Sequence, residues 1–303
     1  MPTFVTGQVE VSVPATSANL GPGFDALGLA LDFRDRVTAQ VTDSGLEIIV
    51  RGAGEGEVPL DENHLVHKAM CRAFEEMGCD VPGIRLRCDN RIPHSRGLGS
   101  SSAAIVAGIC AARGLVAGGS LLMDDDAVFT LAAQIEGHPD NVAPAFYGGF
   151  TIACSGGPER PFATVVSVDP RVAVVVFVPP DPVETQVVRG LLPDVVPHAD
   201  AAANAGRAAL LVAALSRQPE LLLTATEDLL HQSYREPAMP DTLRLVRALR
   251  ADGVPAVISG SGPTVLAFAD TSNQAAIQAR VPAGWQVMTL AVDRRGAQVS
   301  VDE

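Results

Sequence analysis

The chain has 303 residues, of which 47% are hydrophobic, and a formal net charge of -13. This length and apolar content predict a buried core and about two domains rather than a disordered chain. The acidic charge argues against a nucleic-acid partner, because it repels the phosphate backbone. No apolar run reaches the ~18 residues needed to cross a bilayer and no secretory signal is visible, so we expect a cytoplasmic chain without a membrane partner.

The first half predicts strands where apolar residues alternate and helices where they recur at helical spacing. The expected strands are 9–15, 35–41, 46–50 and 83–90, with a turn region at 52–59. The expected helices are 63–77, about 100–115 and 126–135, and glycine and proline break the last one at 137–141. A strand pair begins at 147–150, and 158–161 is the expected domain junction.

The second half predicts a similar mixture. The expected strands are 171–178 and 265–268, the expected helices are 199–215, 221–230 and 241–251, and a last helix and strand close near Val292. Because strands and helices are mixed in both halves, the predicted class is α+β with two domains, 1–160 and 161–303.

Lysine occurs once, at Lys68, and arginine supplies the other fixed positive charges. A P-loop needs a lysine directly after its glycine loop, and no glycine-rich segment here has one. A pyridoxal Schiff base would depend on Lys68 alone, with no supporting pattern around it. Both enzyme classes are therefore excluded. Five scattered cysteines without a C-x-x-C pair indicate reduced thiols and no structural zinc site.

The segment Pro93–Ala104 carries the strongest chemical signal. Gly97 and Gly99 let the backbone approach an anion, and three serines follow at the start of a predicted helix, where free N–H groups and the helix dipole favour phosphate. Such a cradle needs no lysine. An ordinary glycine loop with a serine cap is the alternative that the pattern alone leaves open.

Four segments in order resemble the signatures of the GHMP kinase superfamily. Pro93–Ala104 resembles its nucleotide loop with one extra serine, and Ile258–Thr264 resembles its C-terminal glycine loop. Pro14–Asp25 and Glu136–Asn141 have the form typical of the homoserine kinases within that superfamily. The resemblance extends from Val11 to about Phe268, and several ordered motifs are far more specific than one.

The resemblance implies a two-domain GHMP kinase fold, with a βαβ-type N-terminal ATP-binding domain at 1–160 and a ferredoxin-like C-terminal domain at 161–303. It implies that the γ-phosphate of ATP is transferred to the hydroxyl of L-homoserine with the help of Mg²⁺, a step of threonine biosynthesis. A homodimer stays open, because nothing in the sequence fixes the number of copies.

The resemblance also implies roles for individual residues. The ATP loop comprises Pro93, His94, Ser95, Arg96, Gly97, Leu98, Gly99, Ser100, Ser101, Ser102 and Ala103. The Mg²⁺ ligands are Ser101 and Glu136, which suits a cation that takes few protein oxygens and completes its shell with water and phosphate. The residues around the amino acid are Asn19, Asp25, His138, Asn141, Arg189 and Arg235. Asp25 meets the ammonium group, and the two arginines hold the planar carboxylate.

The expected catalytic residues are Asp140 and Asn141. Phosphoryl transfer through a loose transition state depends mainly on alignment and electrostatics, so we hypothesise that Asp140 positions the hydroxyl rather than taking its proton. Two alternatives stay open: a GHMP kinase for mevalonate-like, sugar or shikimate substrates, and a non-catalytic relative that only binds ligands.

Overall fold

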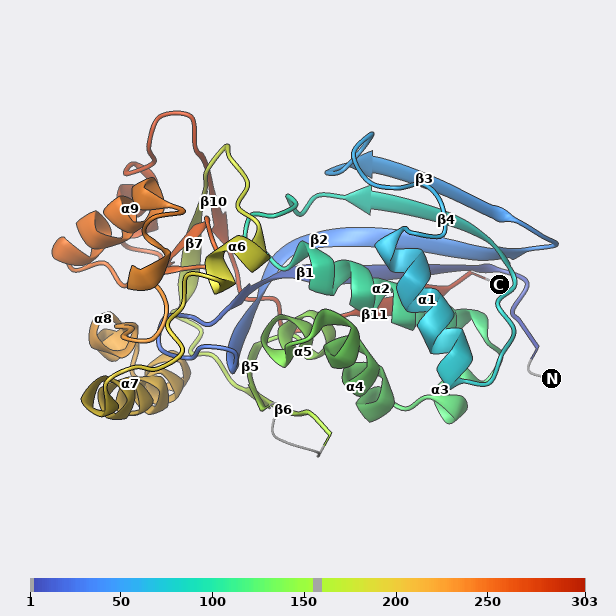
Figure 1. The fold of residues 1–303 in the computed structure, drawn as a ribbon, viewed down its shortest axis with the longest axis horizontal. Helices are drawn as coiled ribbons and strands as arrows, with labels where there is room; N and C mark the ends of the chain where they lie inside the picture. Colours follow the sequence, from blue (N-terminus) through green and yellow to red (C-terminus); the bar gives the residue numbers. More distant parts are fainter. Residues whose placement is uncertain (1–2, 155–159, 303) are drawn as a thin grey trace.

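The computed structural model describes residues 3–154 and 160–302, which form two sheets with their helices (Figure 1). The larger sheet has seven strands in the order β11-β1-β2-β4-β3, and β5 and β6 join it through β2. Its strands are β1 (Gln8–Ala18), β2 (Leu27–Thr42), β3 (Leu46–Gly52), β4 (Gly83–Asn90), β5 (Phe150–Cys154), β6 (Phe162–Val166) and β11 (Gln298–Val301). Its helices are α1 (Leu65–Glu76), α2 (Ser100–Leu115), α3 (Gly119–Leu122), α4 (Asp125–Glu136) and α5 (Pro139–Tyr147).

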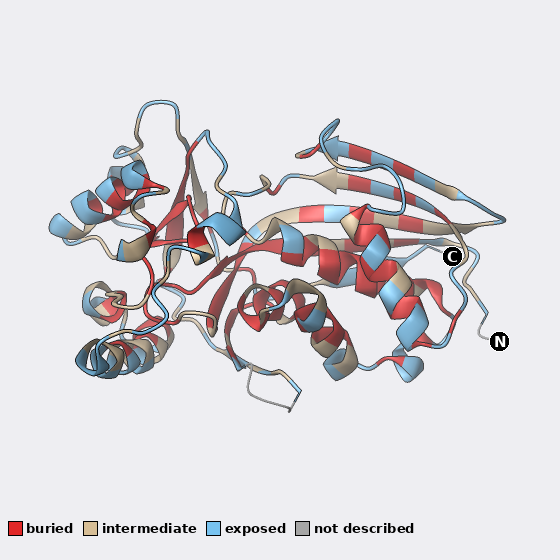
Figure 2. Cartoon of the chain, in the orientation of Figure 1, coloured by how far each residue is buried: buried red, intermediate tan, exposed pale blue. Residues whose placement is uncertain are grey.

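Helix α2 is the centre of this first part. It packs against α1, α4, β1 and β2, and most of its residues are buried, as Figure 2 shows. Strands β3 and β4 are parallel and α1 connects them, which confirms the expected βαβ-type unit. Because α2 is covered on several sides, its N-terminus is held next to β1, where the Thr16 N–H donates to the Leu98 carbonyl just before the helix.

The second part is a four-stranded antiparallel sheet in the order β10-β7-β9-β8. Its strands are β7 (Ala173–Val178), β8 (Ala256–Ile258), β9 (Val265–Ala269) and β10 (Gln286–Leu290), and its helices are α6 (Thr185–Arg189), α7 (His198–Ser216), α8 (Leu222–Ala225), α9 (Pro240–Ala251) and α10 (Gln274–Gln278). Helices separate the first strand from the second and the third from the fourth. This strand order confirms the expected ferredoxin-like arrangement.

Strand β7 joins the two hydrophobic cores. Val175 and Phe177 belong to the core under α9, whereas Val174 and Val176 belong to the larger core that extends into the first part. A strand buried on both faces is apolar at every position, which explains the unbroken apolar run. The two parts therefore share packed side chains at the base of the cavity described below.

Two expected elements are wrong in extent, and one observed strand was not expected. Strand β2 begins at Leu27 rather than Asp35, because its first residues are apolar without alternation and pair with both β1 and β5. The expected helix 221–230 ends at Ala225, because the Asp228 carboxylate accepts the backbone N–H groups that follow and competes with the helix. Strand β11 lies beyond the expected last strand and is too short to give a periodic signal.

Helix α5 was not expected, because proline normally ends a helix. Pro139 occupies its first position, but Pro144 lies inside it and lacks the N–H that would bond the Asp140 carbonyl. That carbonyl instead lies against Gly28, where a Cβ would come within 2.0 Å of the oxygen. A proline and a glycine from different elements thus fix Asp140 against β2.

Part of the expected junction at 158–161 lies outside the described residues. The division at residue 160 stays a prediction, and β6 and β11, which follow it in the chain, pair with strands of the first sheet. Within residues 3–154 and 160–302, no helix combines the length and the apolar character that a membrane crossing requires.

Candidate active site

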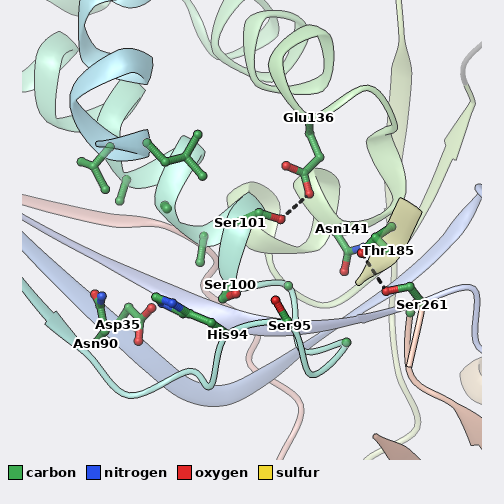
Figure 3. A pocket seen from close by; sticks show the side chains of 18 of the residues that line it. Asp35, Asn90, His94, Ser95, Ser100, Ser101, Glu136, Asn141, Thr185 and Ser261 are labelled. Carbon is green, nitrogen blue, oxygen red and sulfur yellow. Dashed lines mark hydrogen bonds between the residues drawn. The ribbon is translucent and has the colours of Figure 1, made fainter. Parts of the chain in front are cut away.

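A cavity of about 390 Å³ lies where the two parts meet. Its wall includes the loop before α2, the first turn of that helix, and residues of α5, α6 and the C-terminal glycine loop (Figure 3). Both parts of the molecule are therefore needed to form it.

The expected phosphate loop forms one wall. Gly97 and Gly99 have φ angles of 73° and 70°, in the region that favours glycine. A Cβ on Gly99 would lie 1.9 Å from Thr16 Oγ1, and one on Gly97 would lie 2.3 Å from the Ser259 carbonyl oxygen. Helix α2 begins directly after Gly99 with no acidic side chain in its first turn. Its free N–H groups are available to an anion in the cavity.

Two serines at the start of α2 converge on Glu136. The hydroxyls of Ser101 and Ser102 donate hydrogen bonds of 2.7 and 2.8 Å to Glu136 Oε1. Figure 3 shows Ser101 and Glu136 facing each other at the cavity edge. Hydroxyl and carboxylate oxygens are the hard ligands that Mg²⁺ prefers, so this group fits the cation.

Not every residue of the expected ATP loop reaches the cavity. His94, Ser95, Gly97, Gly99, Ser100, Ser101 and Ala103 line it. Leu98 is buried in the core, and the Arg96 guanidinium donates to the carbonyls of Pro179 and Pro180 beyond β7. Arg96 thus attaches the loop to the second part.

At the amino-acid end, Asp25 and Arg189 form a two-bond ion pair. Arg189 Nη2 donates to Asp25 Oδ1 at 2.7 Å, and Nη1 donates to Oδ2 at 3.1 Å. The hydrogen bond to Asp25 raises the pKa of the Arg189 guanidinium above its usual value, so Arg189 stays charged. Asn19 accepts the Asp25 backbone N–H and donates to the Gly260 carbonyl, which links the two glycine loops.

Arg235 is 1% exposed, yet it lines the same cavity. Its Nη1 donates to the Gly260 carbonyl at 2.7 Å, and its Nε has no partner among the described residues. Burial, reinforced by the charge of Arg189, lowers the pKa of Arg235 to about 10. The guanidinium therefore remains charged at neutral pH and is available to an anionic ligand.

Helix α5 contributes three of the expected residues. His138 Nδ1 lies 2.8 Å from Asp140 Oδ1, and Asp140 is 1% exposed. Burial lowers the pKa of His138, but its hydrogen bond to Asp140 and the charges of Asp140 and Glu136 outweigh this, so its pKa is raised. Thr16 donates to Asn141 Oδ1, which leaves the Asn141 amide nitrogen free for the cavity.

A buried layer behind the amino-acid end was missed from the sequence. The His231 ring packs 5.1 Å from the Phe24 ring, and its Nε2 lies 2.7 Å from the Gly21 carbonyl oxygen. The guanidinium groups of Arg189 and Arg235 lie 5.6 and 5.9 Å from the Phe24 ring centre. In the sequence, only the spacing of Asp228, His231 and Arg235 indicates this layer. It was overlooked because a helix was expected at 221–230.

Part of the far end of the cavity was also missed. Asp35, Asn90 and His94 lie close together below α2 (Figure 3). Burial raises the pKa of Asp35 to about 6, although its Oδ1 accepts the backbone N–H groups of Arg91 and Ile92. His94 belongs to the expected ATP loop, whereas Asp35 inside β2 and Asn90 at the end of β4 belong to no motif and were missed.

Family models match both halves of the chain. The model of the GHMP kinases N terminal domain matches residues 64–149, and that of the GHMP kinases C terminal matches residues 202–287. A homoserine kinase of Streptomyces coelicolor is 55% identical over 300 residues, which cover 98% of this chain and 96% of that protein. A homoserine kinase of Clavibacter michiganensis is 50% identical and covers 97% and 94%.

Solved structures agree with these matches. The crystal structure of homoserine kinase from Cytophaga hutchinsonii superposes with a TM-score of 0.85 at 28% identity, over 97% of this chain and 98% of that one. A mevalonate diphosphate decarboxylase from Staphylococcus aureus, at 15% identity and a TM-score of 0.69, covers 97% and 98% and shares the fold alone. The chain belongs to the GHMP kinases and, among them, to the homoserine kinase family.

Proposed function

We propose that this protein transfers the γ-phosphate of ATP to the side-chain hydroxyl of L-homoserine, giving O-phospho-L-homoserine and ADP. The reaction is a step of threonine biosynthesis. The observation that carries the proposal is the cavity itself. A lysine-free phosphate cradle with Ser101 and Glu136 lines the same cavity as Arg189, which is paired with Asp25, and two opposite charges side by side suit an amino-acid zwitterion.

The phosphate end binds the phosphate oxygens through its backbone rather than through a positively charged side chain. Backbone N–H groups at the start of α2 bind the phosphate oxygens, and Gly97 and Gly99 allow their close approach. Ser101 and Glu136 would hold Mg²⁺, which neutralises charge on the phosphates when it is bound. The N–H groups and the helix dipole are fixed before the substrates bind, so they need little rearrangement as charge develops.

The acceptor hydroxyl is oriented by α5. Asp140 is held through His138 and through the close contact of its backbone with Gly28, so its carboxylate has little freedom to move. The Asn141 amide, fixed by Thr16, offers a donor to the hydroxyl or to the transferred group. Both residues position the attacking oxygen in line, which is the main requirement of this reaction.

A coupled ADP-release assay with L-homoserine, L-threonine, L-serine and mevalonate side by side tests the proposal. We expect turnover that depends on L-homoserine and exceeds turnover with the other three. Faster turnover with mevalonate would assign a different GHMP kinase activity. ATP binding without turnover of any acceptor would instead support a ligand-binding regulator.

A further inference from the structure

The two charged side chains that meet the zwitterion in the proposed function are bonded to each other. Asp25 would take the ammonium group and Arg189 would take the carboxylate, yet both oxygens of Asp25 accept hydrogen bonds from Arg189. In this structure the charges of Asp25 and Arg189 are therefore already paired with each other. A ligand must replace an existing ion pair before it can use either group.

Both partners lie in segments that are bonded to other parts of the site. The Asp25 N–H donates to Asn19 Oδ1 at 2.9 Å, and Asp25 has a φ of 54° that fixes the direction of its side chain. Arg189 ends helix α6, whose first residue, Thr185, lies 3.1 Å from the Ser261 hydroxyl (Figure 3). The pair is therefore a built feature of the loops and not a chance contact between two free surface chains.

The pair is also accessible. The side chains of Arg189 and Asp25 are 37% and 32% exposed, so water screens their attraction and a ligand can reach both. An ion pair of this exposure is weak enough to be exchanged. It is still strong enough to disfavour a ligand that breaks the pair without offering a new partner to both Asp25 and Arg189.

Arg235 has a different status at the same end. None of the ion pairs between described residues includes it, and its buried Nε has no partner among them. A carboxylate held by both arginines therefore finds Arg235 free, but it must still take Arg189 away from Asp25. An ammonium group reaches Asp25 only in competition with Arg189.

We propose that the Asp25–Arg189 ion pair determines specificity: a zwitterion replaces it with two new pairs, whereas an alcohol with only one of the two charges leaves one partner unpaired. This inference rests on the proposed function and adds how that site rejects wrong alcohols. Discrimination of this kind works through a penalty on the wrong ligand as well as contacts to the right one.

Equilibrium binding of two truncated ligands tests the inference. 4-Hydroxybutyrate is homoserine without its amine, and 3-aminopropan-1-ol is homoserine without its carboxylate. The variants are Asp25→Asn, which frees Arg189, and Arg189→Gln, which frees Asp25. Arg171→Gln is the matched control, because Arg171 forms a similar two-bond pair with Asp169 outside the cavity.

We expect a crossed result. Asp25→Asn should bind 4-hydroxybutyrate about two- to fivefold more tightly than the wild type, and Arg189→Gln should gain by the same factor for 3-aminopropan-1-ol. Neither variant should gain for the other ligand, and both should lose about tenfold or more for L-homoserine. Arg171→Gln should change none of the three dissociation constants.

Equal losses for all three ligands, or equal gains for both truncated ones, would overturn the inference, because neither depends on which charge is freed. Binding is measured without turnover, so a catalytically weak variant still reports. Failure of the wild type to release ADP with L-homoserine would instead contradict the proposed activity. That result would come from the ADP-release assay and not from these binding measurements.

Discussion

The phosphate end and the amino-acid end of the cavity are built differently. The phosphate end is mostly one continuous segment, Gly97–Ser102, whose backbone does the binding and whose conformation the glycines and α2 fix. The amino-acid end combines side chains from four distant segments: Asp140, Arg189 and Arg235 line the cavity, and Asp25 is paired with Arg189. A backbone site depends on local conformation, whereas a side-chain site depends on the tertiary structure that brings its charges together.

The largest loss of activity is expected at Glu136, where the phosphate end uses a side chain rather than its backbone. Glu136 is its one charged side chain, and Glu136→Gln keeps an acceptor for Ser101 and Ser102 but removes the negative charge. We expect kcat/KM for L-homoserine to fall about 10²–10³-fold, the usual cost of losing one preorganised electrostatic group. The assay is ADP release at several Mg²⁺ concentrations.

Gln134→Ala, at an exposed position of the same helix, is the control and should leave activity unchanged. A loss below about tenfold for Glu136→Gln would mean that the backbone alone carries the phosphate end. The two ends would then differ even more than the structure implies.

Arg235→Lys tests the amino-acid end. Lysine keeps the charge but lacks the planar fork, so it cannot satisfy both the Gly260 carbonyl and a carboxylate. We expect the KM for L-homoserine to rise about 10–100-fold while the KM for ATP changes less than about twofold. Steady-state kinetics with each substrate varied in turn measure the split.

Arg244→Lys on the exposed face of α9 is the matched control. Equal increases in both KM values would contradict the separation of the two ends, because they would show that Arg235 supports the whole cavity.

The difference between a backbone site and a side-chain site also decides how much of each end could be predicted from the sequence. Gly97, Gly99 and the serines indicated a phosphate loop before the resemblance was considered, because contiguous residues carry both the shape and the chemistry, although an ordinary glycine loop stayed open until then. Glu136, Asp25, Arg189 and Arg235 were placed only through the resemblance, since any charged residue taken singly is more often on the surface. The structure brings all four to the cavity wall or to its edge.

The missed features share a physical reason. Phe24, His231 and Asp228 form a layer whose members come from two segments far apart in the chain, the loop after β1 and the segment after α8. Helix α5 was hidden by its own proline, and the start of β2 by its burial on both sides. Periodicity reports one exposed and one buried face, so it fails where an element has no exposed face.

Asp140→Asn should have a smaller effect. If Asp140 positions the hydroxyl, the amide keeps its shape and a hydrogen bond to His138, and kcat should fall about tenfold. Loss of a general base typically costs ~10²–10⁴. Measuring kcat for the two proteins under the same conditions separates the two roles, because only the loss of a general base would lower kcat by ~10²-fold or more.

The smallest effect concerns the buried layer behind the amino-acid end. Burial, only partly offset by the charge of Asp228, lowers the pKa of His231 to about 4. The unfolded chain takes up a proton near pH 6.5, but the folded protein does not, so His231 makes wild-type stability fall as the pH drops from 6.5 toward 4. His231→Gln keeps a donor for the Gly21 carbonyl but cannot take up that proton.

The variant should therefore be less stable than the wild type at pH 7.5, since it loses the ring contact with Phe24. At pH 5 the difference in Tm between the two proteins should be smaller by roughly a few degrees. Asp35 acts in the opposite direction, because its pKa is raised to about 6, but it is present in both proteins and cancels in the comparison. A gap that stays constant with pH would mean that His231 is protonated in the folded state. The layer behind Arg235 would then carry a second positive charge. Buried charge behind the cavity, and not only the side chains that line it, would then shape the amino-acid end.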